Sequence, residues 1–439
     1  MKSPELPPLL TMPPGGALYG LRRDPLGFLT TLARTHGDIV RFRLGDHEPD
    51  LFLLNHPDYI REVLVTHDRS FSKWFSIERI KEVLGDGLFV SEGEFHLRQR
   101  RLVQPAFHRE RIASYADQMT AFAVQLRERW QADAVVDIAR EMNWLAMMIV
   151  GSTLFGANVG SDAEEIRDAL SEILDQFERS ILPFADRADF EQAMSRLDAV
   201  IYRLIQQRRA SGEDRGDLLS MLLLARDSEG DGGGMTDLQL RDEAMTIFLA
   251  GHETSANGLA WCWFLLAQHP EIEAQFHDEV DRTLEGRLPR MDDVSRLSLT
   301  GRIFAEALRM YPPVWAVGRC ALQDVQIAGY TLPRGSVAIM SQYVTHHDER
   351  WFADPARFDP ERWTAEERAR RPRFSYFPFS AGSRACLGEA FAGVEGVLCL
   401  AALAQKWKLR LVPGHRVTLQ PQLTLRARNG IKLRIEPRA

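Results

Sequence analysis

The feature that most constrains the fold is one long helical pattern, which runs from Thr236 to about His269. Thr236 followed by Gln239 is typical of a capping box at a helix start, and Pro270 follows the predicted end. At about 1.5 Å per residue, such a helix is roughly 50 Å long. Because its apolar residues lie on several faces, other helices must surround it. We therefore expect a mainly α fold built round one central helix.

Short strand patterns stand nearer the two ends of the chain. Residues 38–54 predict two strands joined by a turn, and residues 57–224 have mostly helical periodicity. Further strand patterns lie at 325–327, 336–340 and 409–425. The sequence thus predicts a mainly α chain with small β-sheets. We expect a single domain over residues 1–439, with a proline-rich lead-in at residues 1–20 and no fused reductase.

Composition excludes several classes of protein. With 45% apolar and 26% charged residues, the chain is globular rather than disordered. Its four cysteines form no C-x-x-C pair, which argues against a disulfide framework and predicts a cytoplasmic protein. The start of the chain lacks the apolar run of a signal peptide, and the most apolar segment, 246–268, contains His252 and Glu253. We therefore expect no membrane anchor, and we expect no nucleic-acid partner.

Cys386 stands out among the cysteines because of its position. It lies in the run F-S-A-G-S-R-A-C-L-G at 379–388, directly before a helical pattern over 389–400. Backbone N–H groups and the positive dipole at a helix start favour a thiolate over a thiol. Gly382 permits a tight turn that would let a flat ligand approach the backbone, and Arg384 is placed to pair with an anion. The remaining cysteines are expected to be small buried hydrophobic residues: Cys262, Cys320 and Cys399.

This run resembles the haem-binding signature of the cytochrome P450 superfamily, F-x-x-G-x-R-x-C-x-G. The chain matches every fixed position, with Phe379, Gly382, Arg384, Cys386 and Gly388. Five specified residues within ten make the match highly specific. The resemblance implies the mainly helical cytochrome P450 fold and a non-covalently bound haem b. Cys386 would ligate the iron, and its electron donation would favour cleavage of the O–O bond.

Two further motifs resemble the structural lock of this family. Glu306-Ala307-Leu308-Arg309 matches E-x-x-R, whose two ends share a helix face, although such pairs are too common to be specific alone. The segment Asp359-Pro360-Glu361-Arg362-Trp363 resembles the family's PERF segment, whose arginine joins that pair. The resemblance implies that Glu306, Arg309 and Arg362 form a structural lock behind the haem. We interpret Trp363, in place of the commoner Phe, as a conservative change.

The middle of the long helix, A-G-H-E-T at 250–254, resembles the family's [A/G]-G-x-[D/E]-T oxygen groove. Taken alone, a glycine and a carboxylate in an apolar helix fit a local irregularity with a satisfied polar pair equally well. The resemblance implies that Ala250 and Gly251 lie beside the haem and leave room for dioxygen. It also implies that Glu253 and Thr254 are catalytic and pass protons to the oxygen.

Four cationic residues match positions that bind haem propionates in this family. His96 and Arg100 are the two ends of H-x-x-x-R, and Arg319 occupies the place of another propionate-binding arginine. With Arg384, the resemblance supplies three guanidinium groups and one imidazole for two carboxylates.

By the same resemblance, the substrate pocket draws on both halves of the chain. Its candidate residues are aromatic or apolar: Phe71, Trp74, Phe75, Phe248, Val314 and Trp315. They predict a lipophilic ligand, such as a terpenoid, carotenoid, steroid, fatty acyl compound or polyketide.

The resemblance implies a monooxygenase that inserts one oxygen atom from O₂ into a C–H bond or an alkene. Electrons would come from a ferredoxin or flavodoxin with its NAD(P)H reductase. Two alternatives stay open: a peroxide-driven peroxygenase or haem-thiolate isomerase, and a non-enzymatic haem sensor. The acid–alcohol pair Glu253-Thr254 favours the monooxygenase, because the alternatives have less need of it.

The charge of the chain is unevenly distributed. From Arg362 to the end stand fifteen basic and five acidic residues, whereas the preceding residues carry an acidic surplus. Because small ferredoxins are typically acidic, we expect a basic face near Cys386 to receive one. Arg98 and Arg101 would join that face, or belong to an ordinary solvated surface.

Overall fold

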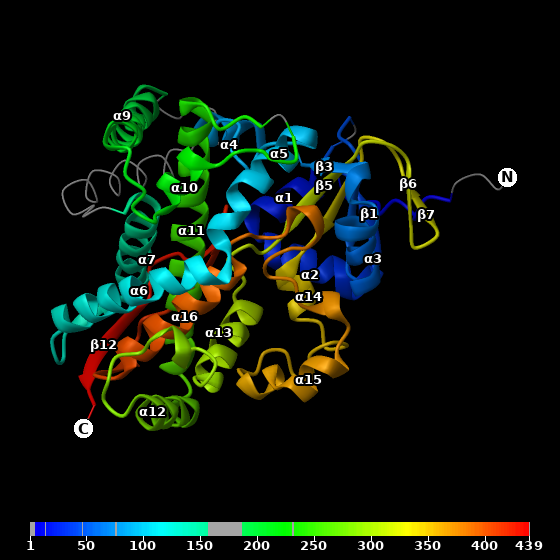
Figure 1. Ribbon diagram of the computed structural model, residues 1–439. Coiled ribbons are helices and arrows are strands. Elements are labelled where there is room, and N and C mark those ends of the chain that lie inside the picture. Colours follow the sequence, from blue (N-terminus) through cyan, green and yellow to red (C-terminus); the bar gives the residue numbers. More distant parts are fainter. Residues whose placement is uncertain are drawn as a thin grey trace. The chain divides into compact units, whose positions relative to one another are not determined.

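The computed structural model describes residues 5–13, 15–45, 47–74, 77–156, 187–230 and 232–438 (Figure 1). These residues form two compact units. Unit 1 comprises Met1–Phe75, Arg302–Cys386 and Leu419–Arg426. Unit 2 comprises Ser76–Gly301, Leu387–Thr418 and Ala427–Ala439.

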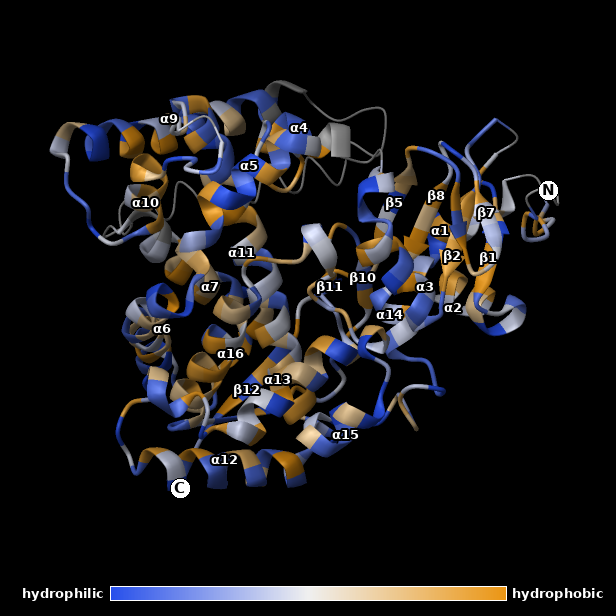
Figure 2. Ribbon diagram, turned by 45° about the vertical axis from the view of Figure 1, so that its right-hand side comes forward, coloured by the Kyte–Doolittle hydropathy of each residue, from blue (hydrophilic) through white to orange (hydrophobic). Residues whose placement is uncertain are grey.

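Unit 1 is organised round a five-stranded sheet of order β1-β2-β8-β5-β3. Its strands are β1 (Ile39–Phe42), β2 (Leu51–Leu54), β8 (Val337–Met340), β5 (Val317–Ala321) and β3 (Phe71–Lys73). β2 and β8 are parallel and the other pairs are antiparallel. All four side chains of β2 are buried, with Phe52 and Leu54 in one core cluster and Leu51 and Leu53 in another. The sheet therefore has hydrophobic packing on both faces, and strands β1 and β2 are largely apolar in Figure 2.

Shorter elements complete unit 1. Its described helices are α1 (Gly16–Arg23), α2 (Pro25–His36), α3 (Pro57–Arg61), α14 (Gln342–His346) and α15 (Ala365–Arg370), with a π-helical turn at Glu62–Thr66. The small strands are β6 (Val325–Ile327), β7 (Tyr330–Leu332), β10 (Leu419–Pro421) and β11 (Leu425–Ala427). Helix α13 (Ser298–Met310) starts in unit 2 and ends in unit 1.

Unit 2 is built round α11 (Asp237–Leu266), which confirms the predicted central helix of this part of the chain. The predicted capping box is present: the Gln239 N–H donates to Thr236 Oγ1 at 3.2 Å, and the Thr236 N–H donates to Gln239 Oε1 at 2.9 Å. Several helices contact α11: α4 (Ile77–Leu84), α7 (Ile138–Phe155), α9 (Arg187–Ser211), α10 (Leu218–Leu224), α12 (Pro270–Leu284) and α16 (Glu389–Ala404).

The rest of unit 2 supports these helices. Helix α6 (Arg109–Arg129) packs against α16 and α7, and α5 (Gly93–Val103) precedes it in the chain. An antiparallel sheet of order β4-β12-β9 is formed by β4 (Val135–Asp137), β12 (Lys432–Pro437) and β9 (Trp407–Leu411). Among the described residues, no helix combines the length and hydropathy needed to cross a membrane.

The predicted elements are largely confirmed, with two differences. β3 and β4 lie inside the span predicted to be helical. Each has three residues and forms by pairing with a distant strand, β5 or β12, which local periodicity does not reveal. Residues 157–186 of that span, and the predicted pocket residue Phe75, lie outside the described part of the chain.

Candidate active site

The Cys386 loop, residues 379–386, is closed by its own backbone in unit 1. The Cys386 N–H donates to the Phe379 carbonyl at 2.9 Å, and the Ala385 N–H donates to the Gly382 carbonyl at 3.1 Å. Ser380 has φ of 58° and Gly382 has φ of 69°, so two residues adopt the left-handed conformation. Cys386 stands three residues before α16 begins at Glu389, as the sequence predicts. Its side chain is exposed.

The structure gives Gly382 a reason in addition to the predicted one. A Cβ atom at this position would overlap the carbonyl oxygen of Leu64, in the π-helical turn of unit 1. The glycine is therefore required by its positive φ and by a close approach to the protein's own backbone, and the predicted approach of a flat ligand stays a prediction.

The other three cysteines have a different environment. Cys262 and Cys399 are buried, and Cys320 is half-buried. Burial raises the pKa of all three thiols above the ordinary range, so they stay protonated at neutral pH. The expectation of buried hydrophobic cysteines is confirmed for Cys262 and Cys399. Cys386 is thus the cysteine best placed to offer a thiolate.

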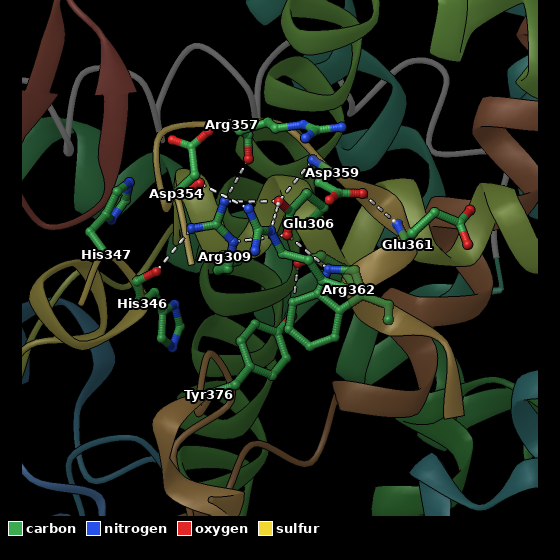
Figure 3. A network of polar contacts seen from close by, with 12 residues as sticks. Glu306, Arg309, His346, His347, Asp354, Arg357, Asp359, Glu361, Arg362 and Tyr376 are labelled. Carbon is green, nitrogen blue, oxygen red and sulfur yellow. Dashed lines mark hydrogen bonds and ion pairs between the residues drawn. The ribbon is translucent and has the colours of Figure 1, made fainter. Parts of the chain in front are cut away.

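Glu306 and Arg309, on α13, form a fully buried ion pair (Figure 3). Arg309 Nε donates to Glu306 Oε2 and Arg309 Nη2 donates to Glu306 Oε1, both at 2.8 Å. The Asp359 N–H also donates to Glu306 Oε1, at 3.1 Å. The third guanidinium nitrogen, Arg309 Nη1, donates to the carbonyl oxygen of His346 at 2.9 Å. Glu306 and Arg309 therefore bind each other and also hydrogen-bond to the backbone at Asp359 and His346.

Trp363 hydrogen-bonds to Glu306 and Arg362 Nε does not, which the sequence did not predict. Arg362 Nε lies 3.4 Å from Glu306 Oε1 and makes no hydrogen bond among the described residues. The Trp363 indole N–H, by contrast, donates to Glu306 Oε2 at 2.9 Å. The interpretation of Trp363 as a conservative change is corrected, because a phenylalanine there would lack this donor.

The A-G-H-E-T segment is a regular part of α11, so the helix shows no local irregularity there. Ala250 is exposed and Thr254 half-buried, although Glu253 and most of their neighbours on α11 are buried. The Thr254 hydroxyl donates to the Ala250 carbonyl at 2.6 Å. A Cβ atom on Gly251 would lie 3.3 Å from Val150 of α7. Close packing against α7 thus favours a glycine at position 251, and the role of Gly251 toward dioxygen stays a prediction.

The predicted propionate-binding residues are distributed over both units. His96 and Arg100 lie one turn apart on α5, where His96 is buried with Nδ1 3.2 Å from the Leu88 carbonyl. In unit 1, Arg384 ends the turn Gly382–Arg384, and the buried Arg319 lies on β5. The role of these four residues toward the propionates stays a prediction.

Arg98 and Arg101 do not form a simple solvated face. Arg101 donates to both oxygens of Asp227, at 3.1 and 3.0 Å, and Arg98 Nη2 donates to the Gly234 carbonyl at 3.0 Å. These two arginines hold the glycine-rich segment before α11, and the hydrogen bonds from Arg101 lower the pKa of Asp227.

The predicted pocket residues have mixed environments. Phe71 is buried in the hydrophobic core of unit 1, on the strand β3 that pairs with β5, and its place in the pocket stays a prediction. Trp74 packs over Gly318, and the Trp315 indole N–H donates to the Gln422 carbonyl at 2.8 Å. Phe248 is buried on α11, and Val314 is half-buried.

Sequence reasoning missed a buried acid next to the A-G-H-E-T segment. Ser255 of α11 donates a hydrogen bond of 2.6 Å to Glu395 Oε2 on α16. Burial raises the pKa of Glu395 to about 8, so this acid is largely protonated at neutral pH. The only signal in the sequence was a single glutamate within the apolar run G-V-E-G-V-L-C-L.

A second buried acid that sequence reasoning missed, Glu243 of α11, holds the segment before α5. Its Oε2 accepts the Leu88 N–H at 3.2 Å and its Oε1 accepts the Gln99 amide at 2.9 Å. Burial raises the pKa of Glu243 to about 7. Because the folded pKa lies above the ordinary value, this group stabilises the fold fully at low pH. That contribution is lost as pH rises through about 7.

Substitution of Glu243 by glutamine is therefore expected to flatten the pH profile of stability. Between about pH 5 and pH 8 the parent should lose about 3 kcal/mol of unfolding free energy that the Glu243→Gln variant keeps. Urea denaturation of both proteins across this range measures the difference. Parallel profiles would show that Glu243 does not titrate in this range.

Comparison with known proteins identifies the family. The cytochrome P450 family model matches residues 6–434. Cyclooctatin synthase of Streptomyces melanosporofaciens is 40% identical, over 98% of this chain and 96% of that protein. Pentalenene oxygenase of Streptomyces avermitilis is 34% identical, over 97% of this chain and 96% of that protein. The crystal structure of the cytochrome P450DA heme domain has a TM-score of 0.90 at 28% identity, covering 99% of this chain and 98% of that one.

The chain therefore belongs to the cytochrome P450 family and has its fold. It is accordingly an enzyme of the monooxygenase class that binds haem b through a cysteine thiolate. Its family needs electrons from a redox partner and acts on lipophilic substrates.

Proposed function

We propose that this enzyme inserts one oxygen atom from O₂ into a C–H bond or an alkene of a terpenoid, with Cys386 as the haem ligand. The observation that carries the proposal is the Cys386 loop. It presents an exposed cysteine from a loop closed by two backbone hydrogen bonds, in a chain whose other cysteines are buried or half-buried. When bound, haem with a thiolate ligand supplies the activation of dioxygen.

Residues of each unit are proposed to hold this cofactor. Arg384 and Arg319 in unit 1, and His96 and Arg100 in unit 2, are the groups that would neutralise its propionates. Ala250 and Thr254, one helical turn apart, form a strip of α11 that the protein leaves partly uncovered, and an apolar face of the cofactor would cover it.

Two observations support a terpenoid substrate. The relatives described above are named for cyclooctatin and for pentalenene, which are terpenoids. The residues proposed to meet the substrate include Trp74, Phe248 and Trp315, whose large apolar surfaces suit a compact polycyclic hydrocarbon. This choice narrows the broader range of lipophilic ligands that the sequence predicts.

For the electron donor we propose a ferredoxin or flavodoxin with its NAD(P)H reductase. Some of the basic residues after residue 361 are neutralised by ion pairs, so fewer of them are available to bind a partner than the sequence indicates. Arg362, Arg410 and Arg438 are held in ion pairs with Glu306, Glu273 and Asp281, respectively. Another group of basic residues lies on or next to β9 and β12 in unit 2: Lys408, Arg416, Arg428, Lys432 and Arg434.

Thr254 and Glu253 are proposed to deliver protons during the reaction. In Thr254→Ala, the product formed per reductant consumed should fall about ten-fold or more, because the hydroxyl is lost while electron uptake continues. Hydrogen peroxide should appear instead. The assay uses a terpene that perturbs the haem spectrum, with ferredoxin and its reductase. Thr254→Ser keeps the hydroxyl and serves as the control; equal coupling in parent, serine and alanine variants would remove Thr254 from the mechanism.

A further inference from the structure

His346 connects two parts of unit 1 that carry different elements of the site. It is the last residue of α14 and is fully buried. Its carbonyl oxygen accepts a hydrogen bond from Arg309 Nη1 at 2.9 Å, and its imidazole Nε2 accepts the backbone N–H of Phe377 at 3.1 Å. His346 thus contacts Arg309 through its backbone carbonyl, as Figure 3 shows, and Phe377, which precedes the Cys386 loop, through its side chain.

Further backbone hydrogen bonds connect Phe377 to the Cys386 loop and close the loop. The Phe377 carbonyl accepts the Ser380 N–H at 3.0 Å, and the Phe379 carbonyl accepts the Cys386 N–H at 2.9 Å. Phe377 is buried in the hydrophobic core of unit 1. Its N–H would therefore lose a hydrogen bond without gaining one from water if the imidazole were removed.

The surroundings of His346 keep the imidazole in one place and in one protonation state. Its ring centroid lies 5.0 Å from that of Tyr376, whose hydroxyl donates to the Ala305 carbonyl at 3.1 Å. The charged or titratable groups that face it are Tyr376, His347 and Arg309. Burial, followed by His347 and Arg309, lowers the pKa of His346 well below the ordinary range. Nε2 is consequently available as an acceptor, which a protonated imidazole would not offer.

We propose that His346 is a positioning residue. Through its Nε2 acceptor it fixes the position of the Cys386 loop relative to the buried Glu306–Arg309 pair. It acts through its hydrogen bond with the Phe377 N–H. The inference rests on the proposed role of Cys386 as haem ligand, and it goes beyond that role by naming what fixes the position of the loop.

Three variants separate the acceptor from the bulk of the side chain. His346→Phe keeps a ring but removes the acceptor. His346→Gln extends its amide oxygen to about the reach of Nε2, and His346→Asn is one carbon shorter. In the reduced CO complex, the ratio of the strongly red-shifted, thiolate-ligated Soret form to the shorter-wavelength form should fall about ten-fold in the Phe and Asn variants. The Gln variant should restore the parent ratio.

Acid titration of the same spectra supplies a second readout. Acid should convert the parent to the shorter-wavelength form, because protonation of His346 removes its acceptor. The Gln variant should keep the red-shifted form down to lower pH, because its amide does not titrate. His347→Phe is the matched control at neutral pH, where its band ratio should match the parent, because the His347 Nδ1 bonds to the Tyr343 carbonyl at 2.8 Å and not to Phe377.

The outcomes separate this inference from the proposed function. If the parent itself lacks the red-shifted band, the assignment of Cys386 fails. If the parent has the band and the Phe and Asn variants keep it in full, or if Gln behaves like Asn, the role of the His346 acceptor is refuted. Should the Phe variant not fold, the comparison of Gln with Asn decides.

Discussion

Replacement of Cys386 by serine is expected to abolish the strongly red-shifted Soret band of the reduced CO complex, and with it all product formation. That band requires a thiolate on the iron, and a serine hydroxyl is a poor substitute at neutral pH. No other cysteine can take over, since Cys262 and Cys399 are buried and burial raises the pKa of their thiols. Absorption spectra of the purified, reduced, CO-treated variant test this expectation.

Cys320→Ser is the matched control for this experiment. Cys320 is half-buried on β5, and burial raises its pKa, so its serine variant should keep the band and the activity. Persistence of the band in Cys386→Ser, or its loss in Cys320→Ser alone, would contradict the assignment of the ligand.

Substitution of Glu306 by glutamine is expected to lower the free energy of unfolding by about 3–5 kcal/mol, because it leaves a buried guanidinium without its counter-charge. Both Glu306 and Arg309 have fully buried side chains. The neutral amide would also present a donor to Arg309 or to the Trp363 indole, each of which needs an acceptor. Urea denaturation and the fraction of protein purified with haem measure the effect.

An exposed pair on the same unit provides the control. Glu366, on α15, pairs with Arg370 at 2.5 Å, and both side chains are mainly exposed. Glu366→Gln should therefore change the free energy of unfolding by less than about 1 kcal/mol. A Glu306→Gln variant as stable as Glu366→Gln would show that the buried cluster is no lock.

Those parts of the fold that depend on local chemistry were predictable from the sequence. The capping box at Thr236, the central helix α11 and the helix after Cys386 follow from periodicity and from residues that satisfy free N–H groups. The three-residue strands β3 and β4 were not predictable, since each exists only through pairing with a strand far away in the chain.

The same division holds for the candidate site. Motif positions such as Cys386 and Glu306 could be named because fixed spacings define them. The partners that complete them come from distant segments: Trp363 for Glu306, His346 for Phe377, and Glu395 for Ser255. A hydrogen bond across such separations leaves no periodic trace in the sequence. Trp363 shows how a substitution that is conservative in shape can add a donor to a buried acid.

The central claim is that this enzyme transfers one atom of dioxygen to a terpenoid. Its most direct test is turnover of a polycyclic terpene, such as pentalenene, under oxygen-18 gas with ferredoxin, its reductase and NADPH. Mass spectrometry of the product should show one heavy oxygen atom per product molecule, and no product when the reductase is left out. Product that carries only oxygen from water, or product that forms with hydrogen peroxide but not with oxygen and the reductase chain, would contradict the claim.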